Sequence, residues 1–142
     1  MQKPDPFHLQ RFTEAQAGVW EQAREELRAG QKRSHWMWFI FPQIQGLGSS
    51  PMAVRYAIGS RGEARAYLEH PVLGERLREL SKIVANLDGR SIEQIFGYPD
   101  DLKFHSSMTL FAQAAEGEPV FAQALAKYFR GELDRATLEQ LA

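Results

Sequence analysis

Aromatic and basic side chains gather in residues 32–43, the stretch of the chain whose residue types best suit ligand binding. It reads Lys-Arg-Ser-His-Trp-Met-Trp-Phe-Ile-Phe-Pro-Gln. Indole rings stack on bases and sugars, and cations bind phosphates, so this pattern is typical of a ligand wall. A buried anchor for the surrounding helices would equally explain the phenylalanines and the isoleucine. The candidate ligand-binding residues here are Lys32, Arg33, Trp36, Trp38 and Gln43.

A loop rich in glycine and serine follows at residues 46–50. Its glycines would let the backbone approach a ligand, and its serines directly precede a helix start, where free N–H groups bind anions. Arg55, one turn into that helix, would add a charge-assisted hydrogen bond. An ordinary turn before a capped helix has the same sequence features. The candidate anion-binding residues are Gly46, Gly48, Ser49, Ser50 and Arg55.

A carboxylate and an imidazole are spaced for one helix face in residues 100–107. Asp101 and His105 are four residues apart, as in a pair that orients a general base. We predict His35 and His105 as the candidate general bases, with Asp101 orienting His105, and Lys103 as a further ligand-binding residue. An acid at a helix start that merely holds a neighbouring histidine is the structural alternative. Two of the four ligands of a metal centre are missing, so we expect no metal. We also expect no cofactor.

Charge is unevenly distributed along a chain whose net charge is −1. That net charge disfavours nucleic-acid binding driven by bulk charge. Between residues 28 and 65, however, six basic residues accompany one acid, Glu63, a local excess of +5. We therefore predict that residues 32–55 fold back on the start of a helix at 100–115 to form one basic, aromatic-walled pocket. The alternative is that Asp100 and Asp101 neutralise these cations internally, or that the cations form a solvated face.

Length and composition indicate one soluble globular domain, residues 1–142, with 44% hydrophobic and 25% charged residues. The absence of cysteine excludes a disulfide scaffold, a thiol nucleophile and a thiolate zinc site. The longest apolar run, residues 36–41, is far shorter than the ~20 residues that span a membrane. The first residues contain no apolar signal core, so we expect a cytoplasmic protein.

Caps, glycines and apolar stripes of helical period predict an all-α fold of seven to nine short helices. Helix starts are predicted at Asp5-Pro6, Ser50-Pro51, Ser60, Pro71, Ser91 and Pro99, with Gly18 dividing the first segment. Residues 31–50 are expected to be irregular, with about one helical turn, and no segment alternates long enough to predict a strand. The predicted core contains Leu77, Leu80, Val84, Phe104, Met108, Phe111, Phe121 and Leu125.

The same stretches carry a family resemblance. Residues 7–12, 32–43, 46–50, 70–74 and 100–111 resemble the family of proteins of unknown function numbered 1810 (DUF1810), over essentially the whole chain. Bacterial members sometimes carry the label "calpastatin", which a compact chain without long disordered repeats does not support. The resemblance implies a small, single-domain, multihelical cytosolic protein. It implies no activity, cofactor or catalytic residue.

Three functions are compatible with the sequence. The first is binding or turnover of a small anionic metabolite, phosphorylated or nucleotide-like, in the predicted pocket. The second is a protein-interaction module that uses an exposed aromatic segment. The third is single-stranded nucleic-acid binding, which the acidic balance disfavours. We expect no membrane partner. The sequence leaves open whether the protein is an enzyme, which reaction it would catalyse and whether it forms oligomers.

Overall fold

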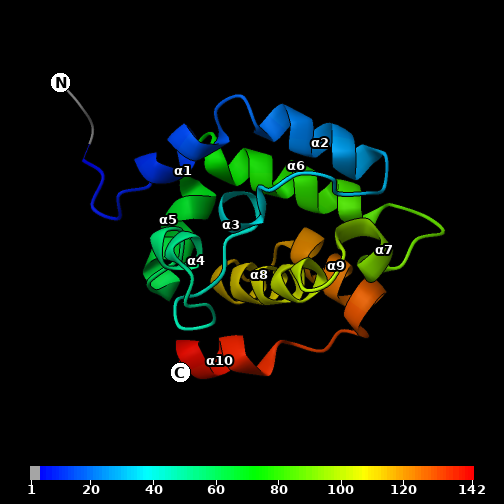
Figure 1. Ribbon diagram of the computed structural model, residues 1–142. Helices are drawn as coiled ribbons and strands as arrows, with labels where there is room; N and C mark the ends of the chain where they lie inside the picture. Colours follow the sequence, from blue (N-terminus) through cyan, green and yellow to red (C-terminus); the bar gives the residue numbers. More distant parts are fainter. Residues whose placement is uncertain (1–3) are drawn as a thin grey trace.

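The computed structural model describes residues 4–142, which fold into ten helices (Figure 1). They are α1 Gln10–Gln16, α2 Trp20–Arg28, α3 Met37–Ile40, α4 Pro51–Arg55, α5 Arg61–Glu69, α6 Leu73–Ala85, α7 Ile92–Phe96, α8 Asp100–Ala114, α9 Pro119–Phe129 and α10 Arg135–Leu141. Within that range no strand forms, and one isolated parallel bridge joins Ile44 to Ile58. The predicted all-α class is confirmed. The helix count exceeds seven to nine because the irregular stretch 31–50 contains a one-turn helix, α3.

Side-chain caps start several of these helices where the sequence predicted. The Ser60 hydroxyl accepts a hydrogen bond from the Glu63 amide at the start of α5. Ser91 and Gln94 form a complete capping box at the start of α7, each side chain accepting from the other residue's backbone N–H. Such a cap typically contributes about 1 kcal/mol. The chain therefore contains its own signals for where helices begin.

The first helix begins later than predicted. Pro6 follows Asp5, but α1 starts only at Gln10, because His8 has a left-handed φ of 54° that a helix cannot accommodate. The Asp5 carboxylate instead accepts from the backbone N–H groups of Leu9 and Gln10, at 2.7 and 3.0 Å. These hydrogen bonds lower the pKa of Asp5 below its ordinary value. Asp5 therefore caps α1, although it lies before the N-cap position Leu9.

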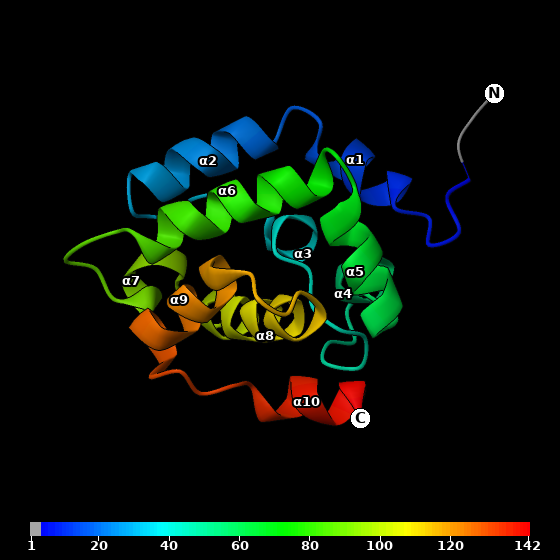
Figure 2. The same ribbon diagram turned by 180° about the vertical axis from the view of Figure 1, so that it is seen from behind.

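Helix α8 lies at the centre of the molecule, with α5, α7, α9 and α10 packed around it (Figures 1 and 2). Helices α2 and α6 lie side by side, and α6 also packs against α9. All eight residues predicted for the core are buried. Because α8 is buried on nearly every side, it presents small polar residues as well as apolar ones to its neighbours. Ser106, Ser107 and Thr109 are all buried.

The aromatic run at residues 36–41 belongs mostly to this core. Trp36 and Phe41 are fully buried, and Phe39 is 7% exposed. Phe41 packs edge-on against Phe104 of α8, with ring centroids 5.1 Å apart, and Phe96 stacks on the same ring at 4.7 Å. Aromatic pairs at these separations are attractive beyond their burial alone. The run therefore anchors α3 to α7 and α8.

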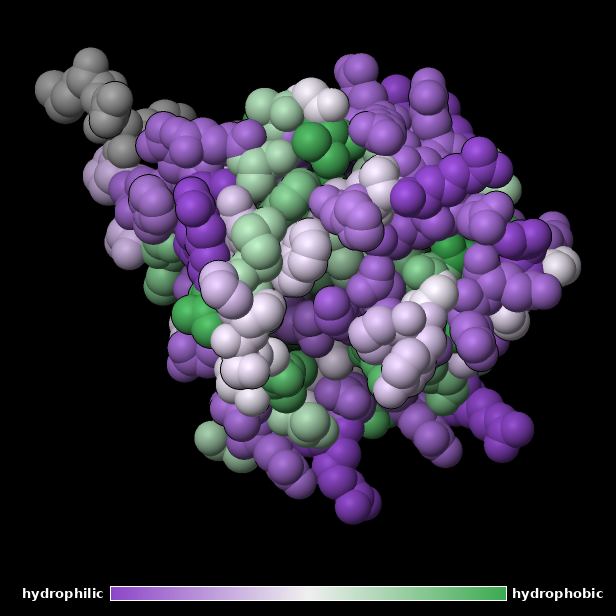
Figure 3. All heavy atoms as spheres, in the orientation of Figure 1, coloured by the Kyte–Doolittle hydropathy of each residue, from purple (hydrophilic) through white to green (hydrophobic). Residues whose placement is uncertain are grey.

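The outer surface is mostly polar. On the face shown in Figure 3, apolar residues occur in small spots and narrow bands between polar ones. The most exposed large apolar side chains are Tyr98, Val54 and Leu102. None of the helices in residues 4–142 is long and apolar enough to cross a membrane.

Candidate functional site

Three chain segments enclose an open cleft of about 550 Å³. They are the loop from residue 43 into α4, the first turns of α8, and the start of α10, which lies below α8 in Figure 1. Six residues that the sequence predicted as candidates line it together: Gln43, Gly48, Ser49, Ser50, Lys103 and His105. Leu47, Ala53, Pro99, Leu102, Ser106, Asp134 and Ala136 complete the lining. The loop at 43–50 and the start of α8 thus meet, as the single-pocket prediction requires.

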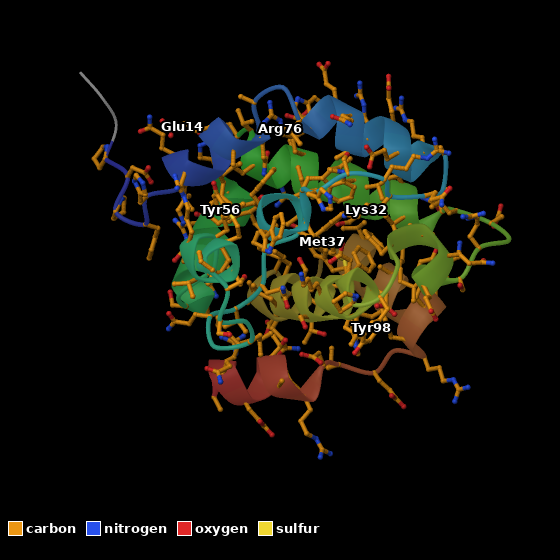
Figure 4. All side chains as sticks on the ribbon, viewed as in Figure 1. Glu14, Lys32, Met37, Tyr56, Arg76 and Tyr98 are labelled. Carbon is orange, nitrogen blue, oxygen red and sulfur yellow. The ribbon has the colours of Figure 1, made fainter. Side chains whose placement is uncertain are left out.

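Two lysines share one carboxylate beside this cleft. Asp100, the first residue of α8, accepts from Lys32 Nζ at 2.9 Å through one oxygen and lies 3.3 Å from Lys103 Nζ through the other. The Lys32 side chain is only 8% exposed, whereas that of Lys103 is 29% exposed. Figure 4 shows Lys32 on the connection between α2 and α3, above α8. Lys32, Lys103 and Asp100 together have two positive charges and one negative charge. Of the two lysines, Lys103 is the more exposed and lines the cleft.

Lys103 also contacts an aromatic ring. Its ammonium lies over Trp38, 5.5 Å from the ring centroid, which is within cation–π range. Trp38 is half-buried, and together with Gln43, Gly46 and Gly48 it lines a small indentation next to the cleft. The carboxylate and the indole therefore fix where the Lys103 ammonium lies. Trp38 borders the candidate site through this lysine.

Trp36 and Lys32, both predicted as ligand-binding residues, do not line the cleft. The Trp36 indole is fully buried and donates its Nε1–H to Glu26 at 3.0 Å. Lys32 lies 5.1 Å from that ring and forms a largely buried ion pair with Asp100. Burying a cation requires a paired partner, and Asp100 fulfils this requirement. The aromatic wall of the predicted pocket is therefore a structural anchor, with Trp38 as its half-buried edge.

Glu26 holds the segment that precedes this anchor in place, and the sequence prediction did not include it. Its carboxylate accepts four hydrogen bonds: from the amides of Arg33 and Ser34, from the Ser34 hydroxyl and from Trp36. Burial raises the pKa of Glu26, but these hydrogen bonds outweigh burial and lower the pKa below its ordinary value. The sequence signal was an acid at the end of α2, one short loop before the aromatic run.

The other predicted basic and loop residues are dispersed. Arg33 and His35 are exposed on the segment before α3, outside the set that lines the cleft. The Arg55 guanidinium lies over Tyr56, 5.5 Å from the ring, and the Arg55 carbonyl accepts from Arg11. Gly46 has a φ of 95°, and a Cβ there would lie 2.7 Å from the Gln140 side chain of α10. Gly46 therefore lets α10 pack closely on the loop.

The burial of the aromatic run limits which rings the two alternative functions could use. The protein-interaction module was predicted to use residues 36–41 as an exposed aromatic patch, and single-strand binding also relies on accessible aromatic rings. Trp36 and Phe41 are fully buried and Phe39 nearly so, which leaves Trp38 half-exposed. Residues 36–41 therefore form no extended exposed aromatic patch, and Trp38 is the one partly accessible aromatic ring among them.

His105 is held by a different partner from the predicted one. Its Nε2 lies 2.8 Å from the carbonyl oxygen of Glu132, and its ring stacks on Phe129 with centroids 4.0 Å apart. A carbonyl oxygen only accepts hydrogen bonds, so Nε2 of His105 carries a hydrogen. Nδ1 is therefore the ring nitrogen that is left for another partner. No hydrogen bond or ion pair joins Asp101 to His105 in the described chain, and Asp101 Oδ1 is buried without a partner. The predicted Asp101–His105 pair is therefore not formed.

Asp134 lines the cleft and was not among the residues that the sequence predicted for the site. Its Oδ2 accepts from the Thr137 amide at 3.0 Å, the Thr137 hydroxyl at 2.6 Å and the Ser106 hydroxyl at 3.2 Å. Its amide donates to the Thr109 hydroxyl at 2.9 Å. Two buried polar residues of α8 thus position the start of α10. A buried polar pair on a central helix was the signal available in the sequence.

A second depression, of about 460 Å³, lies between α5 and the C-terminal end of α8. Arg78 is bound there by both carboxylate oxygens of Glu118, at 2.9 and 2.7 Å, and Arg61 donates to the Gln113 carbonyl. Three arginines and three glutamates line it: Arg61, Arg65, Arg78, Glu69, Glu116 and Glu118. Its formal charge is balanced, as is that of the first cleft, whose charged lining residues are Lys103 and Asp134. The two sites differ in their pairing: Lys103 shares Asp100 with Lys32, whereas Arg78 is paired with both carboxylate oxygens of Glu118.

Comparison with known proteins gives a family. The family model described as "Protein of unknown function (DUF1810)" matches residues 6–141. A crystal structure of the conserved hypothetical protein Rv1873 from Mycobacterium tuberculosis is 59% identical in sequence, with a TM-score of 0.95, over 96% of this chain and 98% of that one. No match is found among curated proteins. The sequence resemblance and the helical fold agree with the family match, and the chain belongs to the DUF1810 family, whose function is unknown.

Proposed function

We propose that the protein binds a small anionic metabolite, phosphorylated or nucleotide-like, in the cleft between α4, α8 and α10. The observation that carries the proposal is the shared carboxylate: Asp100 serves both Lys32 and Lys103, and a single carboxylate cannot neutralise two ammonium groups. Partly buried charges favour a counter-charge close by. An anionic group beside Lys103 would supply it.

The rest of the lining suits the polar body of such a ligand. Ser49 and Gln43 present a hydroxyl and an amide from the loop, and Leu102 and Pro99 present apolar surface from the start of α8. Small-molecule sites combine apolar walls with a few convergent polar groups in this way. The cleft volume of about 550 Å³ lies within the range of such sites. The proposal concerns binding and assigns no reaction to the cleft.

Replacement of the cleft lysine tests the proposal. We expect AMP or inorganic phosphate to shift the amide NMR signals of residues 43–50 and 100–106. We expect Lys103→Gln to weaken binding at least ~10-fold, since hydrogen bonds to charged groups contribute about 1.5–3 kcal/mol. Arg33→Gln is the matched control, because it removes an exposed cation outside the cleft. Unchanged affinity in Lys103→Gln, or no binding of either probe at millimolar concentration, would contradict the proposal.

A further inference from the structure

We propose that Asp134 makes the cleft selective for a phosphate ester that carries hydroxyl groups, such as a sugar or polyol phosphate, over an anion without hydroxyls. This inference rests on the proposed function, because it specifies which anionic ligands the same cleft accepts. Its basis is that a carboxylate and an ammonium line one cleft without pairing with each other. No ion pair joins Asp134 to Lys103 within the part of the chain that the structure describes.

The Asp134 carboxylate is held rigidly and keeps one acceptor free. Oδ2 takes all three hydrogen bonds from Thr137 and Ser106, and the backbone N–H is fixed to Thr109. Oδ1 accepts no hydrogen bond among residues 4–142. A carboxylate anchored at one oxygen cannot turn away from an approaching ligand. Its second oxygen is therefore a preorganised acceptor, which lowers the entropic cost of binding.

An ionised carboxylate accepts hydrogen bonds and repels negative charge. Within one small cleft, the repulsion disfavours an anion that lies close to Asp134, whereas a hydroxyl group donates to the same oxygen. The Lys103 ammonium, fixed between Asp100 and Trp38, offers the attraction that the anionic group needs. A ligand that satisfies both groups has its phosphate toward Lys103 and its hydroxyls toward Asp134. A polyol phosphate has this polarity.

Two phosphate monoesters of similar size separate the possibilities. Glycerol 3-phosphate carries two hydroxyls, and propyl phosphate carries none. By isothermal titration on the full chain, we expect glycerol 3-phosphate to bind at least ~5-fold more tightly. Asp134→Ser retains a good helix cap, because serine ranks with aspartate at that position, but removes the free oxygen and the charge. In this variant we expect the preference to fall below ~2-fold, with propyl phosphate binding more tightly than to the unmodified chain.

Asp88→Ser is the matched control, because Asp88 is a fully exposed acid outside the cleft and its loss changes the net charge equally. It should preserve the preference. Equal affinity for both esters, or a preference that Asp134→Ser leaves intact, would overturn the inference while the anion site itself remains. If neither ester binds, this inference fails, and the proposed function fails with it only if AMP and inorganic phosphate do not bind either. Asp134→Asn, also a good cap, replaces Asp134→Ser if circular dichroism shows that the serine variant does not fold.

Discussion

Glu26 shows how one side chain decides whether an aromatic segment becomes core or binding surface. By accepting hydrogen bonds from two loop amides and the Trp36 indole, it turns the ring inward, where the N–H would otherwise lack a partner. In the sequence, charged residues beside tryptophan were compatible with a ligand wall as well as with a buried anchor. The deciding partner lies on α2, and a linear pattern does not indicate which acid the indole meets.

Removal of the Glu26 charge should destabilise the fold. We expect Glu26→Gln to lower the free energy of unfolding at pH 7 by about 1–3 kcal/mol, because four donors then converge on an amide that offers one acceptor oxygen. Urea denaturation measures the change. Glu25→Gln, an exposed neighbour on α2, should change stability by less than ~0.5 kcal/mol. Equal effects of the two substitutions would contradict the structural role of Glu26.

The same carboxylate should make stability depend on pH. Because folding lowers the pKa of Glu26, its contribution is fully present above the unfolded-state pKa and disappears as the pH falls through the folded-state value. The difference in unfolding free energy between the unmodified chain and Glu26→Gln should therefore shrink below about pH 4.5. Denaturation series at pH 7 and in this acidic range measure it. A difference that stays constant or grows on acidification would exclude this linkage.

At the scale of elements, the spacing of apolar residues in the sequence predicts the long helices well. The stripe of Leu77, Leu80 and Val84 predicts α6 and its buried face, and the same holds for Phe104 and Phe111 of α8. Short elements are harder, because a single turn such as α3 has no stripe and depends on tertiary packing. Gln16, buried in α1, donates to the Phe39 carbonyl at 2.8 Å and so holds α3 from another helix.

The stripe of α6 should be sensitive to cavity formation. Leu80 is 1% exposed at the interior face of this helix, so Leu80→Ala should lower the free energy of unfolding by about 2–5 kcal/mol. Lys82→Ala, at an exposed position of the same helix, is the control and should have little effect. Thermal and urea denaturation measure both variants. A loss below ~0.5 kcal/mol for Leu80→Ala would mean that the stripe does not pack against the core.

At the scale of the whole molecule, the cleft exists because segments far apart in the sequence meet at the start of α8. The sequence predicted that residues 32–55 fold back on the start of the helix at 100–115, and the loop at 43–50 does line one cleft with Lys103 and His105. It did not indicate α10, whose contribution depends on the contacts of Asp134 with Ser106 and Thr109. Internal neutralisation of the cations by Asp100, which the sequence offered as the alternative, is what the structure shows for Lys32, and the packing of α7 against α8 brings Asp100 to it.

Helix α10 should open before the rest of the fold. It packs mainly against α8 along one side of the cleft, and Thr137 is its one residue buried within the described chain, whereas α6 and α8 contain many (Figure 1). Elements with few buried contacts open locally at a lower free energy than global unfolding. In native-state hydrogen exchange, the amides of α10 should exchange at least ~100-fold faster than those of α8, a difference of about 2.7 kcal/mol in opening free energy.

A saturating anionic ligand in the cleft should reduce this difference in exchange rate between α10 and α8. The ligand binds the form in which α10 is packed on α8 and so stabilises that form. Exchange of α10 at the same rate as α8, with or without ligand, would show that α10 opens only when the whole domain unfolds.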